Sequence, residues 1–131
     1  MSHVPTDYTE NILDHNQHPR NWGTLTNPTI ATEENNPLCG DKIHYDLKFK
    51  GEKLVEIGFS GKGCAISKGA GSILSEWAVG KTKKELEKLD TKDIYEMIGI
   101  ELSPARAKCG MLGFAVLKKA LTLIKIEKST S

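Results

Sequence analysis

Residues 42–60 read KIHYDLKFKGEKLVEIGFS, and this stretch decides what the rest of the chain has to cover. Between Lys42 and Lys50 apolar and polar side chains alternate, which is typical of a strand with one buried face. The apolar positions, predicted to face the core, are Ile43, Tyr45, Leu47 and Phe49. The polar positions, predicted to face solvent, are Lys42, His44, Asp46 and Lys48. After a turn at Gly51-Glu52 the alternation resumes, with Val55, Ile57 and Phe59 as its apolar members. Such a short connection predicts an antiparallel hairpin.

Helical patterns supply a cover for the apolar face of this hairpin. From Ala65 small and apolar side chains recur at intervals of three and four residues until Gly80 ends the pattern. Further helix starts are predicted at Thr82 with Glu85 in a capping box, at Asp90 or Thr91, and at Ser103-Pro104. The last of these helices is long, and its buried face carries Phe114, Leu117, Leu121 and Ile124.

A short helix at 8–15 and a first strand at 29–34 complete the pattern. Strands followed by helices predict an α+β fold, in which helices pack on one face of a small antiparallel sheet of about three strands. We expect a single domain over 1–131, with flexible tails at 1–6 and 128–131.

Composition and charge exclude several functional classes. The chain has 131 residues, 38% of them hydrophobic and 27% charged, with a formal net charge of +1. This balance gives no electrostatic basis for binding nucleic acid or an anionic membrane, and no apolar run is long enough to span a bilayer. The N-terminus lacks a secretory signal, so we expect a cytoplasmic protein. Its three cysteines would then be free thiols rather than a disulfide framework.

Those three cysteines occupy special positions. Cys39 lies on the Asn36–Asp41 glycine loop before the strand, and Cys64 lies between a glycine-rich strand end and a helix start. Cys109 falls in the first turns of the helix that begins at Ser103-Pro104. Unpaired N–H groups at a helix start favour a thiolate. Any one of the three alone is equally well read as a small core residue, but the three together favour a site assembled by folding.

Asp41 is the natural fourth ligand, because it lies two residues from Cys39 on the same loop. Thiolates suit zinc and iron–sulfur clusters, whereas a carboxylate weakens and opens such a site. The alternative for Asp41 is an exposed turn residue. Arg106 and Lys108 add positive charge beside Cys109. We assign all four histidines of the chain to structure or solvent.

Several motifs resemble the iron–sulfur cluster assembly scaffolds of the IscU, NifU N-terminal and SufU family. The N-terminal stretch from Tyr8 to Gly23 is similar to the start of these proteins. The segments that match the three ligand motifs are Asn-Pro-Leu-Cys39-Gly-Asp41, Gly-Lys-Gly-Cys64-Ala-Ile-Ser and Arg106-Ala-Lys108-Cys109. The motifs occur in the right order, and the resemblance covers nearly the whole chain.

The resemblance implies a scaffold rather than an enzyme. Cys39, Cys64 and Cys109 would ligate a transient [2Fe–2S] cluster, and Asp41 would join the coordination or tune the lability of the cluster. Sulfur would come from a cysteine desulfurase, and the cluster would pass to apo-proteins. The resemblance also implies a possible homodimer around the cluster, and zinc in the cluster-free protein.

Two departures from the family pattern keep an alternative open. Housekeeping IscU proteins carry a histidine where this chain has Lys108, and a protonated lysine has no lone pair for a metal. The Arg-x-Lys-Cys form instead resembles SufU, a zinc-dependent sulfurtransferase, although the insertion that SufU carries between its second and third cysteines is missing. The chain also has Leu102-Ser-Pro-Ala-Arg106 where IscU proteins that use a dedicated chaperone read Leu-Pro-Pro-Val-Lys. A purely structural zinc protein is a third interpretation.

Overall fold

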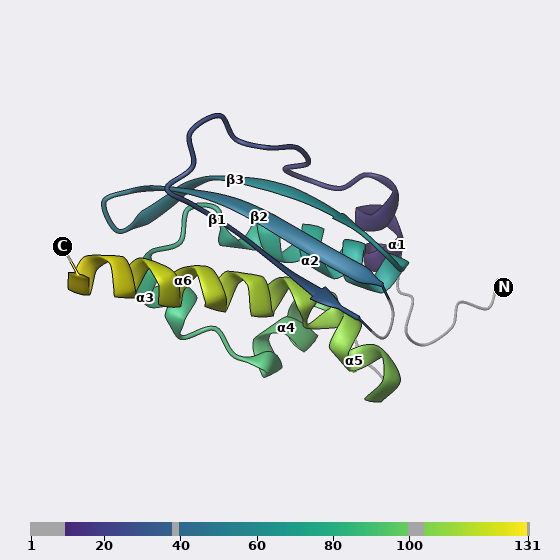
Figure 1. The fold of residues 1–131 in the computed structure, drawn as a ribbon. Helices are drawn as coiled ribbons and strands as arrows, with labels where there is room; N and C mark the ends of the chain where they lie inside the picture. Colours follow the sequence, from purple (N-terminus) through teal and green to yellow (C-terminus); the bar gives the residue numbers. More distant parts are fainter. Residues whose placement is uncertain (1–9, 38–39, 100–103, 131) are drawn as a thin grey trace, which may run out of the picture.

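The structure is a computed structural model that describes residues 10–37, 40–99 and 104–130. Within these ranges it is the α+β fold that the sequence predicts, a three-stranded antiparallel sheet with helices packed on one face (Figure 1). The strands, in the order β1-β2-β3, are β1 (Ile30–Asn36), β2 (Asp41–Lys50) and β3 (Lys53–Lys62). The helices are α1 (Glu10–Gln17), α2 (Ala65–Ala78), α3 (Lys83–Glu87), α4 (Thr91–Ile98), α5 (Pro104–Gly110) and α6 (Leu112–Thr130).

The predicted hairpin of β2 and β3 forms around Gly51, whose φ of +63° is a conformation that glycine adopts without steric cost. Its register shifts between Lys48 and Phe49, which leaves Val55 of β3 outside the paired ladder as the extra residue of a β-bulge. Because a bulge reverses the alternation, Leu54 is fully buried and Val55 is only half-buried. The predicted inward position of Val55 is therefore wrong.

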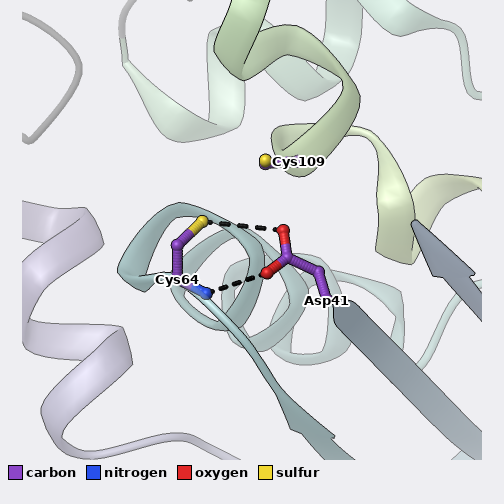
Figure 2. A group of neighbouring side chains, drawn as sticks. All are labelled: Asp41, Cys64 and Cys109. Carbon is purple, nitrogen blue, oxygen red and sulfur yellow. Dashed lines mark hydrogen bonds between the residues drawn. The ribbon is translucent and has the colours of Figure 1, made fainter. Parts of the chain in front are cut away.

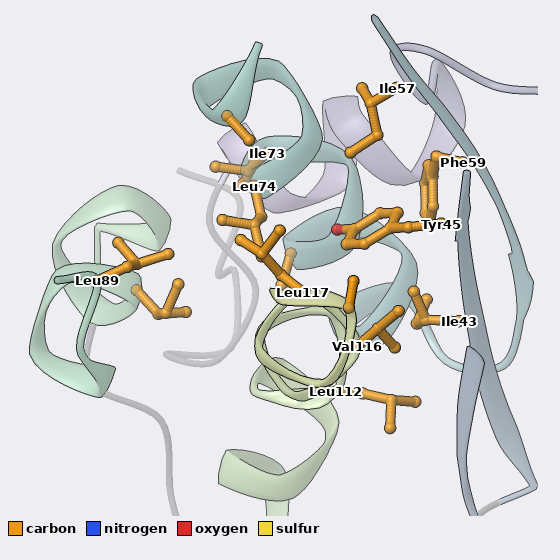
Figure 3. Packing of buried hydrophobic residues seen from close by; sticks show 14 of the residues in the cluster. Ile43, Tyr45, Ile57, Phe59, Ile73, Leu74, Leu89, Leu112, Val116 and Leu117 are labelled. Carbon is orange, nitrogen blue, oxygen red and sulfur yellow. The ribbon is translucent and has the colours of Figure 1, made fainter. Parts of the chain in front are cut away.

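The apolar face of the sheet packs against α2 and α6, and Figure 3 shows the side chains that fill this layer. Tyr45 and Phe59 are its largest fully buried side chains, and the Tyr45 hydroxyl donates to the backbone carbonyl of Gly71. A Cβ at Gly71 would lie 3.0 Å from the Phe59 ring, and one at Gly113 would lie 2.8 Å from the Tyr45 hydroxyl. Gly71 of α2 therefore allows a close approach to the sheet, as predicted, and Gly113 does the same for α6.

The outer face of the sheet is covered in part by the connection from α1 to β1, which passes on the side away from α2 and α6 (Figure 1). Gly23 N–H donates to the Phe59 carbonyl at 2.9 Å, and Leu25 N–H donates to the Asp46 carboxylate at 2.9 Å. Asp46 is consequently 4% exposed, and its predicted place in solvent is wrong. The cover has no hydrophobic periodicity, so the alternation within β2 alone cannot reveal it.

The C-terminal part forms two helices where the sequence predicts one. The short helix α5 ends at Gly110 and α6 begins at Leu112, with the weak helix formers Gly110 and Gly113 on either side of the break. After Gly113, α6 contains no further glycine and no proline, and it continues to Thr130. Residues 128–130 of the predicted tail are therefore part of this helix. The predicted tail at 1–6 lies outside the described residues. Among the described helices, none combines the length and apolar character that crossing a membrane requires.

Candidate metal centre

Asp41 is the first residue of β2 and is 1% exposed. The alternative prediction, that Asp41 is an exposed turn residue, is therefore wrong. Gly40 precedes it with a φ of +72°, in the left-handed region, and its N–H closes the turn onto the Asn36 carbonyl at 2.8 Å. This turn directs the Asp41 carboxylate inward, toward the start of α2. The Asp41 Oδ1 accepts the Cys64 N–H at 3.0 Å.

Cys64 is the N-cap residue of α2, as the sequence predicts, and its side chain is half-buried. It follows Gly63, whose φ is +133°. A Cβ at Gly63 would overlap the Asp41 carboxylate, so glycine is the residue that lets Asp41 reach the Cys64 N–H. Cys64 Sγ donates to Asp41 Oδ2 at 3.7 Å (Figure 2).

Cys109 brings the third group from a different part of the chain. It lies in the last turn of α5, not in the first turns of a long helix. The predicted stabilisation of its thiolate by the N–H groups of a helix start therefore does not apply to Cys109. The residue is 2% exposed, and its sulfur lies close to Asp41 and Cys64 (Figure 2). The ligand atoms of Asp41, Cys64 and Cys109 all lie within 4.8 Å of one another.

In the metal-free protein, hydrogen bonds join the Asp41 carboxylate to the two thiols. Burial alone would raise the pKa of Asp41, but hydrogen bonds from Ser67, Cys109 and Cys64 more than offset it and hold that pKa below its usual value. Burial, the hydrogen bond to Asp41 and the neighbouring Cys64 sulfur all raise the pKa of Cys109. Cys109 therefore stays a thiol that donates to the carboxylate, and a bound cation has to replace that proton.

The donor set fits a thiophilic metal. A tetrahedral ion with metal–sulfur bonds of about 2.3 Å separates its ligand atoms by roughly 3.5–3.8 Å. Cys64 Sγ and Asp41 Oδ2 are already 3.7 Å apart. The distances from Cys109 Sγ to these two ligand atoms are at most 4.8 Å, so Cys109 would have to move by only about 1 Å to reach the same spacing. Two sulfurs and one oxygen suit zinc or iron, whereas magnesium and calcium prefer oxygen ligands alone.

The structure does not test the other three predicted site residues. Cys39 falls outside the described residues, so its part in the site stays a prediction. Lys108 is exposed on α5 and lines a surface hollow of about 350 Å³ with Pro37 and Met111. Arg106 is half-buried on the same helix. Their electrostatic role stays a prediction as well.

Sequence reasoning missed Ser67, which is 0% exposed and donates its hydroxyl to Asp41 Oδ2 at 2.7 Å. The signal was present, because Ser67 follows the N-cap residue Cys64 by three positions and so faces the start of the helix. The three described histidines have other partners: His15 is buried against Ser72, the His18 N–H donates to the Asp14 carbonyl, and His44 lies beside Asp46.

The chain has clear relatives among known proteins. A family model described as the NifU-like N-terminal domain matches residues 7–130. The zinc-dependent sulfurtransferase SufU of Bacillus subtilis (strain 168) is 31% identical, over 92% of this chain and 92% of that protein. The iron-sulfur cluster assembly scaffold protein IscU of Streptococcus pyogenes serotype M1 is 32% identical, over 87% of this chain and 82% of that protein.

Solved structures show the same fold. The crystal structure of a putative iron-sulfur cluster assembly scaffold protein for the SUF system from Fervidobacterium islandicum AW-1 superimposes with a TM-score of 0.76 at 29% identity, over 88% of this chain and 96% of that one. A NifU-like N-terminal structure from Brucella abortus gives a TM-score of 0.77 at 19% identity, over 92% of this chain and 95% of that one. The second likeness concerns the fold alone.

Proposed function

Because the chain belongs to the NifU-like N-terminal domain family, we propose that it is a scaffold on which a [2Fe–2S] cluster is assembled and from which the cluster passes to apo-proteins. The IscU relatives carry the scaffold name, and this chain spans most of their length. The cluster is the cargo of such a protein, so the site has to bind it firmly enough to assemble it and loosely enough to release it.

The mixed donor set of the buried centre supports this function most strongly. Asp41 places a hard carboxylate oxygen beside the sulfurs of Cys64 and Cys109, within 4.8 Å. Thiolates hold iron tightly, whereas a carboxylate exchanges more readily. A site made of both kinds of ligand suits a transient cluster better than a permanent one. Cys39 would add the third thiolate.

A cysteine desulfurase is the proposed sulfur donor. A scaffold thiolate attacks the outer sulfur of the enzyme's persulfide, and the thiolate of the enzyme leaves. Reducing that sulfur to sulfide takes two electrons, which an external donor supplies. Cys64 and Cys109 are both free cysteines, and the reaction needs a reducing compartment such as the cytoplasm to keep them so.

A homodimer around the cluster remains part of the proposal.

A zinc-dependent sulfurtransferase is the second candidate function. The Bacillus subtilis relative bears that name, and the three described donors are of the types that zinc binds. In this case zinc would hold the cysteines, and one thiolate would accept the sulfur without any iron. This alternative would make the protein a sulfur-transfer enzyme rather than a scaffold.

Anaerobic purification with iron, sulfide and zinc analysis separates the two functions. The scaffold proposal predicts visible charge-transfer absorbance after reconstitution, with equimolar iron and sulfide, and transfer of the cluster to apo-ferredoxin. The Cys64→Ser variant should lose most of that absorbance. Zinc that iron and sulfide cannot displace, together with zinc-dependent stimulation of the desulfurase, would instead favour the sulfurtransferase.

A further inference from the structure

Ser67 is a fully buried hydroxyl in the first turn of α2. Its Oγ donates to Asp41 Oδ2 at 2.7 Å and lies 3.7 Å from Cys64 Sγ. A buried hydroxyl is costly unless it is hydrogen-bonded, and the partner here is the carboxylate of the candidate centre.

With this contact, each carboxylate oxygen of Asp41 accepts a hydrogen bond. The backbone N–H of Cys64 donates to Oδ1 at 3.0 Å, and Ser67 donates to Oδ2. Both donors belong to the start of one helix, so they are fixed relative to each other. Because each oxygen has its own donor, the carboxylate can rotate only by breaking both hydrogen bonds.

The same hydrogen bonds also fix the direction in which the Asp41 carboxylate points. With the Ser67 contact in place, Asp41 Oδ2 lies 3.7 Å from Cys64 Sγ, and the Cys109 sulfur lies within the same 4.8 Å group. Cys109 comes from α5, which contacts α2 across the centre. The orientation of Asp41 therefore depends on α2, whereas the third donor comes from another helix.

We propose that Ser67 is a positioning residue for metal binding, whose hydroxyl holds the Asp41 carboxylate toward the two thiols and so sets how fast a bound zinc ion leaves. This inference rests on the proposed function, because it takes Asp41, Cys64 and Cys109 to be ligands. Outer hydrogen-bond partners of metal ligands typically change metal affinity by about 10- to 100-fold when they are removed. We expect an effect of that size from Ser67→Ala, mainly as faster dissociation.

Ser75 provides a matched control on the same helix. It is also a fully buried serine, and its hydroxyl donates to the Ser72 carbonyl at 2.7 Å. It lies two turns, roughly 12 Å, farther along the axis and outside the centre. Ser75→Ala removes a buried hydroxyl of the same kind without touching Asp41.

The experiment titrates wild type, Ser67→Ala, Ser67→Thr and Ser75→Ala with Co(II), a spectroscopic substitute for zinc, and measures zinc release to a chelator. Circular dichroism melts report the fold of each variant. We expect Ser67→Ala to shift the ligand-field bands of Co(II) and to release zinc about 10- to 100-fold faster. Ser75→Ala should keep the wild-type spectrum and release rate even if its melting temperature falls, and Ser67→Thr, which retains a hydroxyl, should stay within threefold of wild type.

Each outcome decides one claim. A folded Ser67→Ala protein with the wild-type Co(II) spectrum and zinc release rate would overturn the positioning role, while metal binding by wild type left the proposed function standing. If Ser67→Ala does not fold, a folded Ser67→Thr protein with a tenfold faster release would overturn it equally. Failure of both wild type and Ser75→Ala to bind Co(II), zinc or a cluster would instead overturn the proposed function itself.

Discussion

Asp41 and Asp46 lie on the same strand, and both carboxylates are almost entirely buried, with 1% and 4% exposed. Asp46 has partners that serve the fold: His44 Nε2 lies 2.7 Å from its Oδ1, and the Leu25 N–H donates to its Oδ2. It ties the connection between α1 and β1 to the outer face of the sheet. Asp41 faces the other way, toward a hydroxyl and two thiols.

The difference shows that burial of a carboxylate does not by itself indicate a metal site; the partners decide. The partners of Asp46 are a histidine ring and a backbone N–H. The thiols beside Asp41 carry protons that a metal can replace. We therefore expect one structural and one exchangeable carboxylate on the same strand, and the following predictions test that distinction from the largest expected effect to the smallest.

Replacing the thiols should have the largest effect. Cys64→Ser and Cys109→Ser should each lower bound iron and sulfide on reconstitution by at least tenfold, because an alkoxide is a poor substitute for a thiolate at iron. Cys39→Ser should do the same if Cys39 is the third thiolate. Any one of these variants with a full cluster content and the wild-type lifetime would remove that cysteine from the site.

Gly63→Ala should weaken zinc binding, because it displaces the Asp41 carboxylate from the site. A methyl group there overlaps the Asp41 carboxylate, whereas at Gly23, which also has a positive φ, a methyl group meets nothing within 4 Å. Backbone strain costs about 1–3 kcal/mol at either position, so both variants should lose stability in urea melts. Only Gly63→Ala should weaken zinc binding as well, and equal weakening in Gly23→Ala would contradict the steric explanation.

Asp41→Ala and Asp46→Ala compare the two carboxylates directly. Asp41→Ala should lengthen the lifetime of a bound cluster in air and slow its transfer to apo-ferredoxin, because the exchangeable ligand that admits solvent is gone. Asp46→Ala should leave the cluster lifetime unchanged and cost about 1–3 kcal/mol of unfolding free energy, through the lost contacts with His44 and Leu25. Faster cluster decay in Asp41→Ala would show that Asp41 holds the cluster instead of loosening it.

The pH dependence of the metal-free protein should report Cys109. Its pKa is raised in the folded state above the ordinary value of 9.0, so its contribution to stability is complete below pH 9 and is lost as pH rises above that value. The depressed pKa of Asp41 acts in the opposite direction, and its contribution is lost in acid, as pH falls below 3.8. Urea melts of wild type and Cys109→Ala should therefore converge above pH 9. A constant difference between them in that range would contradict the raised pKa.

Lys108 should have the smallest effect, because its side chain is exposed. Lys108→Glu should weaken metal binding about two- to fivefold at low salt, and Lys108→Arg should not change it, as expected for a screened charge beside Cys109. Lys50→Glu, at the far end of β2, is the matched control for net charge. Equal weakening by Lys108→Glu and Lys50→Glu would leave Lys108 as a solvated surface residue.

Most of the fold followed from local patterns. The alternation predicted β2 and the antiparallel pairing with β3, and the glycines before Cys64 correctly marked the start of α2. The bulge at Val55 could not be predicted, because it depends on how two strands pair rather than on either strand alone. The break between α5 and α6 is also tertiary, since glycines such as Gly110 occur inside helices at a modest cost.

The sequence motifs name the candidate donors, but not how these donors are arranged. Short motifs identified Asp41, Cys64 and Cys109, which the fold brings within 4.8 Å. Nothing in the sequence indicated that Asp46 is buried, because its cover is an irregular segment. Ser67 was missed because a serine in a helix start has many ordinary reasons to be there.

X-ray absorption at the zinc edge of the zinc-loaded protein tests the metal centre most directly. Wild type and Asp46→Ala should show the same mixed shell of sulfur and oxygen, with sulfur at about 2.3 Å. Asp41→Ala should lose an oxygen ligand from that shell, and Cys64→Ser should lose a sulfur. A shell of nitrogen and oxygen alone, or one that is unchanged in both Asp41→Ala and Cys64→Ser, would show that the metal binds elsewhere.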